Sequence, residues 1–165
     1  MLKHPIEWSH LGYDYLTPIK SLWRKGFHTG LDLNGPGSGN DDLGTPIHAL
    51  GKGKVIFTNK FIVPGWGRMV VIEHRFIDEK GQNRTVWGRY AHLNEIRCYV
   101  NQEVDDKTVI ATLGKTGTQF AHLHFDMFKV NPKGNYYQYI WGWNRDRVAG
   151  YYANIHFMVA NWNNV

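Results

Sequence analysis

The sequence has a single cysteine, no long apolar run and no dense block of charge. Cys98 has no partner for an internal disulfide and no reactive-thiol signature around it, so we expect a buried or half-buried thiol. No stretch approaches the roughly 20 apolar residues that span a bilayer, which argues against membrane insertion. Residues 1–15 lack the apolar core of a signal peptide, so we expect a protein that acts outside the cytoplasm to need another route of release.

The composition is that of one folded domain. The 165 residues suit one hydrophobic core, and 42% hydrophobic with 20% charged residues argue against disorder. The net charge of +5 comes from scattered basic residues and would suit an anionic wall polymer or nucleic acid. Because no nucleic-acid-binding motif is present, we do not expect nucleic acid as a partner. We expect one domain over 1–165, and a monomer.

Glycine and aromatic residues are plentiful, which favours strands and turns over long helices. Five segments rich in Val, Ile, Phe and Tyr are predicted strands: 54–58, 69–74, 85–92, 108–113 and 122–128. A polar turn at 78–82 predicts a hairpin. Since strands and helices do not alternate, we expect a mainly β, antiparallel, sandwich-like domain with irregular, aromatic-rich terminal segments.

The motif-bearing core spans about 26–128, and 129–165 form a C-terminal extension whose role the sequence does not show. We expect one short helix in this extension, near 148–159.

Nine histidines are many for this length, and they divide into two groups. The first group lies in irregular segments or among apolar residues, where a structural or surface role is expected: His4, His10, His48, His74 and His156. The second group lies within more informative motifs: His28, His92, His122 and His124.

His122 and His124 lie two apart in a predicted strand, so they share one face at roughly 7 Å. One could bind a metal while the other reaches a water or substrate on that metal. A surface or hydrogen-bonded pair would fit this spacing equally well. The intervening Leu123 and the following Phe125 would face the core.

His28 and Asp32 lie four residues apart, about 13 Å on a straight strand. Gly30 and the glycine-rich 35–39 argue against a helix, but Gly30 could supply a bend that lets the two side chains converge. With one histidine of the HLH pair they would make two histidines and one carboxylate, the ligand set of a catalytic zinc site. A hydrogen-bonded loop pair is the alternative interpretation.

Six segments follow one another in a fixed order: HTGLD (28–32), GTPIHALGKGKVI (44–56), WGRMVVIEH (66–74), RYAHL (89–93), GKTGT (114–118) and HLHFD (122–126). Together they resemble the lysostaphin-type (LytM-type) zinc peptidoglycan endopeptidases. The resemblance implies a duplicated hybrid motif fold, with a cleft floored by an antiparallel sheet. It implies one Zn²⁺ held by His28, Asp32 and His124, with His92 and His122 as active-site histidines that do not bind the metal.

Three features depart from the family pattern. The stretch 34–44 is long, the stretch 118–121 before HLH is short, and Asp126 stands where glutamate is common. We expect all three on loops or cleft rims, where they would alter specificity more than zinc binding.

The zinc would supply a Lewis acid and lower the pKa of a bound water toward ~7. We favour His122 as the base that takes the proton of that water, because it shares a face with His124. His92 would stabilise the developing negative charge, although the sequence leaves these two roles interchangeable.

Aromatic residues next to the motifs are candidate substrate contacts, with core packing as the alternative: Trp23, Trp66, Tyr90 and Phe120. Asp41 and Asp42 could meet an amine of the substrate, but we favour a solvated loop.

The leading prediction is a zinc endopeptidase that cuts peptide bonds in bacterial cell-wall stems or cross-bridges. A phage-type endolysin that gathers in the host cytoplasm and acts on the wall at lysis would fit. The alternatives are a catalytically silent regulator of other wall hydrolases and a zinc N-acetylmuramoyl-L-alanine amidase. Silent relatives usually lack the zinc ligands, whereas all of them are present here.

Overall fold

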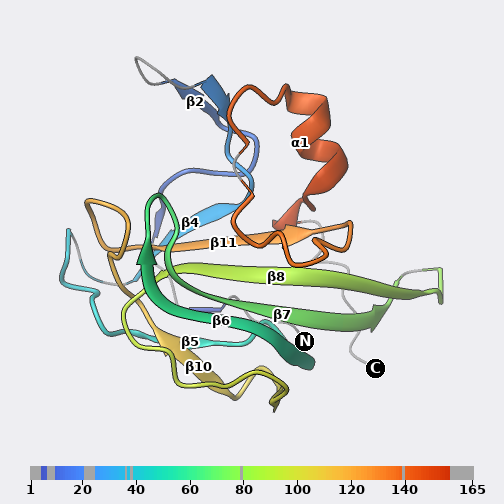
Figure 1. Cartoon of the computed structure of the whole chain (residues 1–165), viewed down its shortest axis with the longest axis horizontal. Helices are drawn as coiled ribbons and strands as arrows, with labels where there is room; N and C mark the ends of the chain where they lie inside the picture. Colours follow the sequence, from blue (N-terminus) through green and yellow to red (C-terminus); the bar gives the residue numbers. More distant parts are fainter. Residues whose placement is uncertain are drawn as a thin grey trace.

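A computed structural model describes residues 5–6, 10–20, 25–35, 37, 39–78, 80–138 and 140–156. The main element is a seven-stranded antiparallel sheet with the order β1-β4-β11-β8-β7-β6-β9 (Figure 1). Two small two-stranded sheets accompany it, β10-β5 and β2-β3. The strands are β1 (His10–Leu11), β2 (Pro18–Lys20), β3 (Lys25–Phe27), β4 (Leu31–Asn34), β5 (Pro46–His48), β6 (Gly53–Val63), β7 (Gly67–Ile77), β8 (Asn83–Leu93), β9 (Glu103–Val104), β10 (Val109–Thr112) and β11 (Leu123–Phe128).

The mainly β, antiparallel prediction is confirmed, and each of the five predicted strands coincides with an observed one. The predicted hairpin also forms. The Asp78 N–H donates to the Gln82 carbonyl at 2.9 Å, and Gly81 takes a φ of 73°, which a side chain would strain. Strands β7 and β8 extend beyond the predicted ends up to this turn, where Ile77 pairs with Asn83, and β6 extends to Val63, which pairs with Gly67 of β7.

Apolar side chains cover both faces of the large sheet, which gives it the expected sandwich-like layering. On one face, β5 and β10 contribute Ile47 and Ile110 to a core that includes Leu123 and Phe125, so these two residues face the core as predicted. On the other face, the helix α1 (Arg145–Tyr151) lies over the sheet and buries Val148 (Figure 1).

The terminal segments are more regular than expected. The N-terminal part contains β1, β2 and β3, and α1 begins three residues before the predicted helix. Asn144 explains that start, because its side chain accepts a hydrogen bond from the Arg147 N–H at 2.9 Å. The predicted helix positions 157–159, and also His4 and Trp23, lie outside the described residues. Within the described part, no helix is long and apolar enough to span a membrane.

Two buried titratable side chains have structural roles. Cys98 is buried, as predicted, and burial raises the pKa of its thiol to about 11. His74 is fully buried in β7, and its Nδ1 lies 3.0 Å from the Lys52 carbonyl oxygen. Burial lowers the pKa of His74 to about 4, so the imidazole is neutral and Nδ1 donates to that carbonyl.

The buried His74 predicts a loss of stability in mild acid. The unfolded chain binds a proton at this side chain below about pH 6.5, whereas the folded chain does so only below about pH 4. The contribution of the neutral His74 to the free energy of unfolding is therefore complete above pH 6.5. It falls by about 2 kcal/mol between pH 7 and pH 5. Urea unfolding of the wild type and of His74→Gln at both pH values measures this difference. An equal pH dependence in the two proteins would contradict it.

Candidate metal centre

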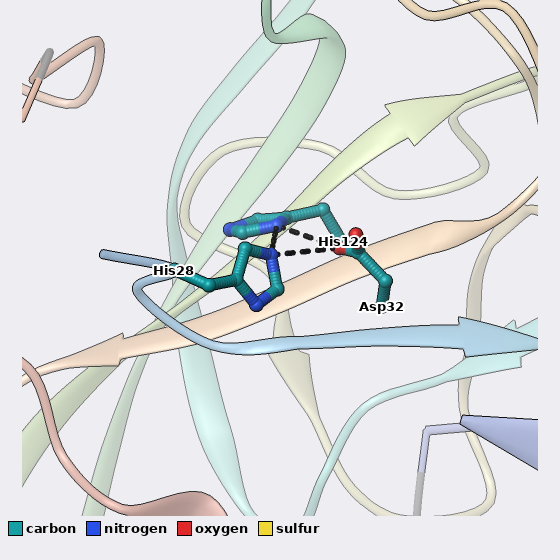
Figure 2. Close-up of side chains that lie close together, drawn as sticks. All are labelled: His28, Asp32 and His124. Carbon is teal, nitrogen blue, oxygen red and sulfur yellow. Dashed lines mark hydrogen bonds and ion pairs between the residues drawn. The ribbon is translucent and has the colours of Figure 1, made fainter. Parts of the chain in front are cut away.

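Three side chains converge where β4 pairs with β11. His28 precedes β4, Asp32 lies within it, and His124 lies directly opposite Asp32 in the β4–β11 register. The His28 Nε2, Asp32 Oδ1 and His124 Nδ1 atoms are each 3.0 Å from the other two (Figure 2). The predicted convergence of HTGLD with one histidine of HLH is therefore present in the structure.

Gly30 permits this convergence through close strand approach. A Cβ atom at this position would lie 2.1 Å from the Phe125 carbonyl oxygen and 2.5 Å from the Asp126 Cβ. Its φ is not positive, so glycine is required by space rather than by backbone conformation. The absence of a side chain here lets the HTGLD segment lie directly against β11.

Hydrogen bonds on the far side of each imidazole orient the two histidines. The His28 Nδ1 lies 3.1 Å from the Asp14 carbonyl oxygen, and the His124 Nε2 lies 3.2 Å from Asp126 Oδ2. We assign the ring protons to these outer nitrogens, because each faces an acceptor. A cation bound between them would leave the inner nitrogens free to direct lone pairs at it, whereas without a cation a proton on an inner nitrogen lets it donate to the Asp32 carboxylate.

This donor set fits a zinc ion. Zinc takes histidine nitrogens and carboxylate oxygens at about 2.0–2.2 Å in tetrahedral geometry, which places neighbouring ligand atoms roughly 3.3 Å apart. The observed 3.0 Å separations are close to this value. Three protein ligands would leave a fourth position for water or substrate, as in catalytic zinc sites.

The local electrostatics favour positive charge at this position. Burial opposes protonation of His124, but Asp126 and Asp32 outweigh it and raise its pKa to about 9. Burial likewise opposes ionisation of Asp32, yet hydrogen bonds from His124 and His28 hold its pKa well below the usual range. The same negative surroundings would attract a metal cation.

A fully buried ion pair lies beneath His124. The Arg89 guanidinium donates to both Asp126 oxygens, from Nε at 3.0 Å and from Nη2 at 2.5 Å. The Thr29 hydroxyl donates to the same carboxylate at 2.5 Å. Burial opposes ionisation of Asp126, but the Arg89 charge outweighs this effect and keeps its pKa far below normal. Asp126 is therefore an anion that holds His124 in place.

The prediction that Asp126 lies on a loop or cleft rim is wrong. It lies inside β11 with no exposed surface, on the same face as His122 and His124. Sequence reasoning missed its role and that of Arg89, although the alternation of β11 carries a signal. Residues 122, 124 and 126 share one face, so the second histidine is adjacent to a carboxylate.

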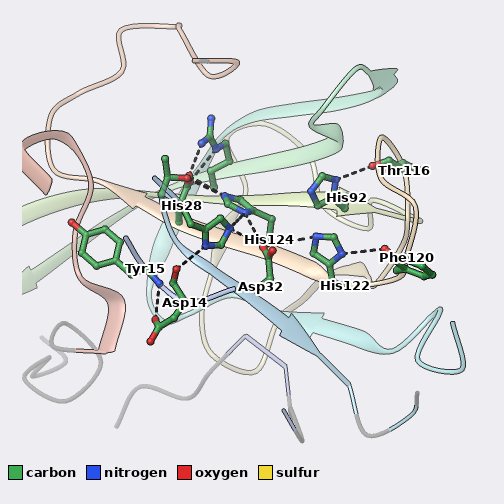
Figure 3. A network of polar contacts seen from close by, with 12 residues as sticks. Asp14, Tyr15, His28, Asp32, His92, Thr116, Phe120, His122 and His124 are labelled. Atoms are coloured by element: carbon green, nitrogen blue, oxygen red, sulfur yellow. Dashed lines mark hydrogen bonds and ion pairs between the residues drawn. The ribbon is translucent and has the colours of Figure 1, made fainter. Parts of the chain in front are cut away.

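The two other predicted active-site histidines lie beside the ligand set (Figure 3). The ring centroids of His92 and His122 are 4.7 Å apart, and the His122 Nε2 is 3.8 Å from Asp32 Oδ1. Each Nδ1 faces a carbonyl oxygen, that of Thr116 at 2.9 Å for His92 and that of Phe120 at 3.0 Å for His122. With protons there, both rings keep an unprotonated Nε2.

Burial makes both of these imidazoles neutral at pH 7. It lowers the pKa of His92 to about 3, with further contributions from His122 and His124, and it also lowers the pKa of His122. His92 has a φ of 63°, unusual for a residue with a side chain, and its N–H donates to the Trp66 carbonyl at 3.1 Å. Such strained backbone is typical of residues whose side chain must take a set direction at a functional site.

The predicted substrate-contacting aromatics lie in three different environments. Trp66 lines the cavity over the ligand set and packs edge-on against His124 at 5.5 Å. The Phe120 ring is exposed, and its contact with substrate stays a prediction. The prediction for Tyr90 is wrong, because its ring is fully buried in the core and its hydroxyl accepts the Leu50 N–H at 2.8 Å. Its neighbour Arg89 faces the site instead, since strand side chains alternate.

The solvated-loop prediction for Asp41 and Asp42 is wrong for Asp42. This side chain is buried, and its Oδ2 accepts the Gly35 N–H at 2.8 Å. Asp42 therefore stabilises the long stretch after HTGLD, whereas Asp41 is exposed.

A cavity of about 300 Å³ opens above the three candidate ligands. Trp66, His92 and His122 line it together with Thr29 and Thr118. Apolar side chains form a further wall: Tyr13, Ile19, Ile140 and Trp141. The volume and the mixture of apolar and polar groups suit a small part of an extended substrate.

Comparison with known proteins agrees with this geometry. The chain is 34% identical over 105 residues to the peptidoglycan DD-endopeptidase ShyB of Vibrio cholerae, covering 63% of this chain and 21% of ShyB. It is 30% identical over 112 residues to the murein hydrolase activator NlpD of Escherichia coli, covering 66% of this chain and 26% of NlpD. A solved zinc-containing peptidase from Vibrio cholerae matches with 28% identity and a TM-score of 0.59, over 75% of this chain and 35% of that one.

The chain thus spans about a quarter of the length of these two curated relatives. The profile of peptidase family M23 matches residues 26–139, which include the three candidate ligands and the two neighbouring histidines. The chain therefore belongs to peptidase family M23, in agreement with the resemblance of its ordered motifs to the lysostaphin-type peptidases.

Proposed function

We propose that this chain is a zinc-dependent endopeptidase that hydrolyses peptide bonds in bacterial peptidoglycan. The observation that carries the proposal is the triangle of His28 Nε2, Asp32 Oδ1 and His124 Nδ1, with sides of 3.0 Å and with the outer ring nitrogens facing acceptors. These three residues would hold one zinc ion. The DD-endopeptidase activity named for ShyB supports peptidoglycan as the substrate.

When bound, zinc supplies a Lewis acid for the scissile carbonyl and lowers the pKa of water. His122 is the proposed general base, because its neutral ring presents Nε2 toward the ligand set at 3.8 Å from Asp32 Oδ1. It would take the proton of the attacking water at Nε2 and pass it to the leaving amine. His92 lies beside it, and its ring would stabilise the charge that develops on the carbonyl oxygen only when Nε2 also carries a proton, because Nδ1 already donates to the Thr116 carbonyl.

A second candidate function is regulation without catalysis, because NlpD is named as an activator of murein hydrolases. Two observations favour the enzyme. The complete donor set is present, and the two neutral histidines lie next to it with their Nδ1 protons held by carbonyl groups.

The proposal includes cleavage of a peptide bond in the cross-linked stems and a role in cell lysis like that of an endolysin, and one experiment tests each. Purified peptidoglycan is digested with the chain, and the new termini are identified by mass spectrometry. New amino and carboxyl termini within cross-linked peptides would support an endopeptidase. Sugar-free stem peptides would indicate an amidase, and intact muropeptides would contradict both. Lysis of whole cells by added protein tests the endolysin-type role.

Removal of any candidate ligand should abolish zinc binding. We expect His28→Ala, Asp32→Ala and His124→Ala to retain less than a tenth of the zinc of the wild type, because two remaining ligands leave the ion exchangeable. Metal content after gel filtration is measured by atomic emission. His48→Ala, which changes a half-buried histidine in β5, is the matched control and should retain full zinc. Full zinc in a ligand variant would refute its assignment.

Removal of either neighbouring histidine should slow turnover without loss of metal. We expect His122→Ala and His92→Ala to lower kcat by roughly 10²- to 10⁴-fold, the usual contribution of a positioned acid or base. Zinc content and release of muropeptides from purified wall are measured on the same samples. Near-normal turnover in zinc-loaded His122→Ala would exclude it as the base.

The buried carboxylate beneath His124 should tune the affinity for zinc. Asp126→Asn removes the anion that accepts from His124 Nε2, so we expect the zinc Kd to rise by about 10- to 100-fold. Competition with a chromophoric chelator measures this Kd. Because Arg89 loses its buried partner, samples must first match the wild type by circular dichroism. An unchanged Kd in folded protein would show that Asp126 has no effect on the metal.

A further inference from the structure

The cavity above the ligand set has an apolar wall that the family match does not include. Ile19, Ile140 and Trp141 line this cavity, yet all three lie outside residues 26–139. They come from the two ends of the chain, and Figure 1 shows β2 and the segment before α1 on the same side of the large sheet. The wall is therefore built by parts of this chain beyond the shared family region.

The N-terminal part of the wall is fixed to the ligand segment by main-chain hydrogen bonds. The Asp32 N–H donates to the Tyr13 carbonyl at 2.9 Å, and the His28 N–H donates to the Thr17 carbonyl at 2.9 Å. From there the chain enters β2, where Ile19 pairs with Gly26 of β3. The position of Ile19 thus follows directly from the position of the candidate zinc ligands.

The C-terminal part of the wall is fixed to β3, the strand that pairs with β2. The Gly142 N–H donates to the Lys25 carbonyl at 3.0 Å, next to Trp141. Ile140 is buried against Gly26, where an added Cβ would lie 3.2 Å from the Ile140 Cδ1. The paired strands β2 and β3 therefore bring Ile19 together with Ile140 and Trp141 along one edge of the cavity.

The chemistry of the cavity disfavours charged substrate groups at this wall. Among the described residues that line it, the only carboxylate is Asp32 of the ligand set, and no lysine, arginine or glutamate is present. A charged side chain placed against Ile19 and Ile140 would lose hydration without gaining a partner. An apolar side chain would instead bury surface there.

We propose that Ile19, Ile140 and Trp141 form a specificity subsite that holds an uncharged, apolar side chain of the peptide substrate next to the scissile bond. This inference rests on the proposed peptidase function, because it uses the same cavity. Beyond that function, the subsite defines which class of substrate residue is accepted next to the scissile bond. It also gives a role to Ile140 and Trp141 of the C-terminal extension.

Binding to an inactive protein tests the subsite apart from catalysis. Two synthetic stem-peptide dimers are compared, one with alanine at the cross-link and one with glutamate at the same positions. Zinc-loaded His122→Ala protein is titrated with each by calorimetry. We expect the alanine dimer to bind at least tenfold more tightly, and the added Trp141→Ala change to reduce the ratio below threefold. Trp141 is 39% exposed, so its truncation should leave the fold intact.

A matched control and a second variant complete the test. Tyr99→Ala removes another exposed aromatic side chain away from this cavity and should leave the binding ratio unchanged. Ile19→Ala should lower the ratio in the same direction as Trp141→Ala. A ratio that neither variant changes, or equal binding of the two dimers, overturns the subsite. Selective binding together with no cleavage by the wild type would keep the subsite and reject the peptidase function.

Discussion

The pairing of β4 with β11 is the constraint on which the rest of the site depends. It places Asp32 opposite His124, two residues 92 positions apart in the chain, and so brings a carboxylate against an imidazole. The pairing needs Gly30, because any Cβ there would collide with the Phe125 carbonyl. His28, at the start of the same segment, then reaches the two side chains without a helix.

The buried Arg89–Asp126 pair links this pairing to the other layers of the structure. Two charges with no exposed surface are tolerated because each satisfies the other, and the pair gives His124 a fixed acceptor. The guanidinium also stacks 3.6 Å above the Trp66 ring and donates to the Tyr136 carbonyl at 2.8 Å. Tyr136, which follows the motif-bearing core of residues 26–128, is thereby anchored beneath the candidate metal centre.

Much of the fold was predictable because strand signals are local. Alternating apolar residues, glycine-rich turns and the 78–82 turn predicted five strands in their correct places. The errors at Tyr90 and Asp126 share one physical cause. The hydrophobic pattern assigns a charged residue to the surface, but Arg89 and Asp126 compensate each other across β8 and β11 inside the protein. That pairing places Arg89 on the site face and Tyr90 in the core.

The sequence by itself determined the strand-rich core, the order of its motifs and the chemical nature of the donors at His28, Asp32 and His124. Only the tertiary structure decided that these donors meet at 3.0 Å, that a buried carboxylate supports them, and that Ile140 and Trp141 reach the same cavity. The reason is that such contacts join residues far apart in the chain. Their distances depend on strand register and packing, which no local pattern of residues specifies.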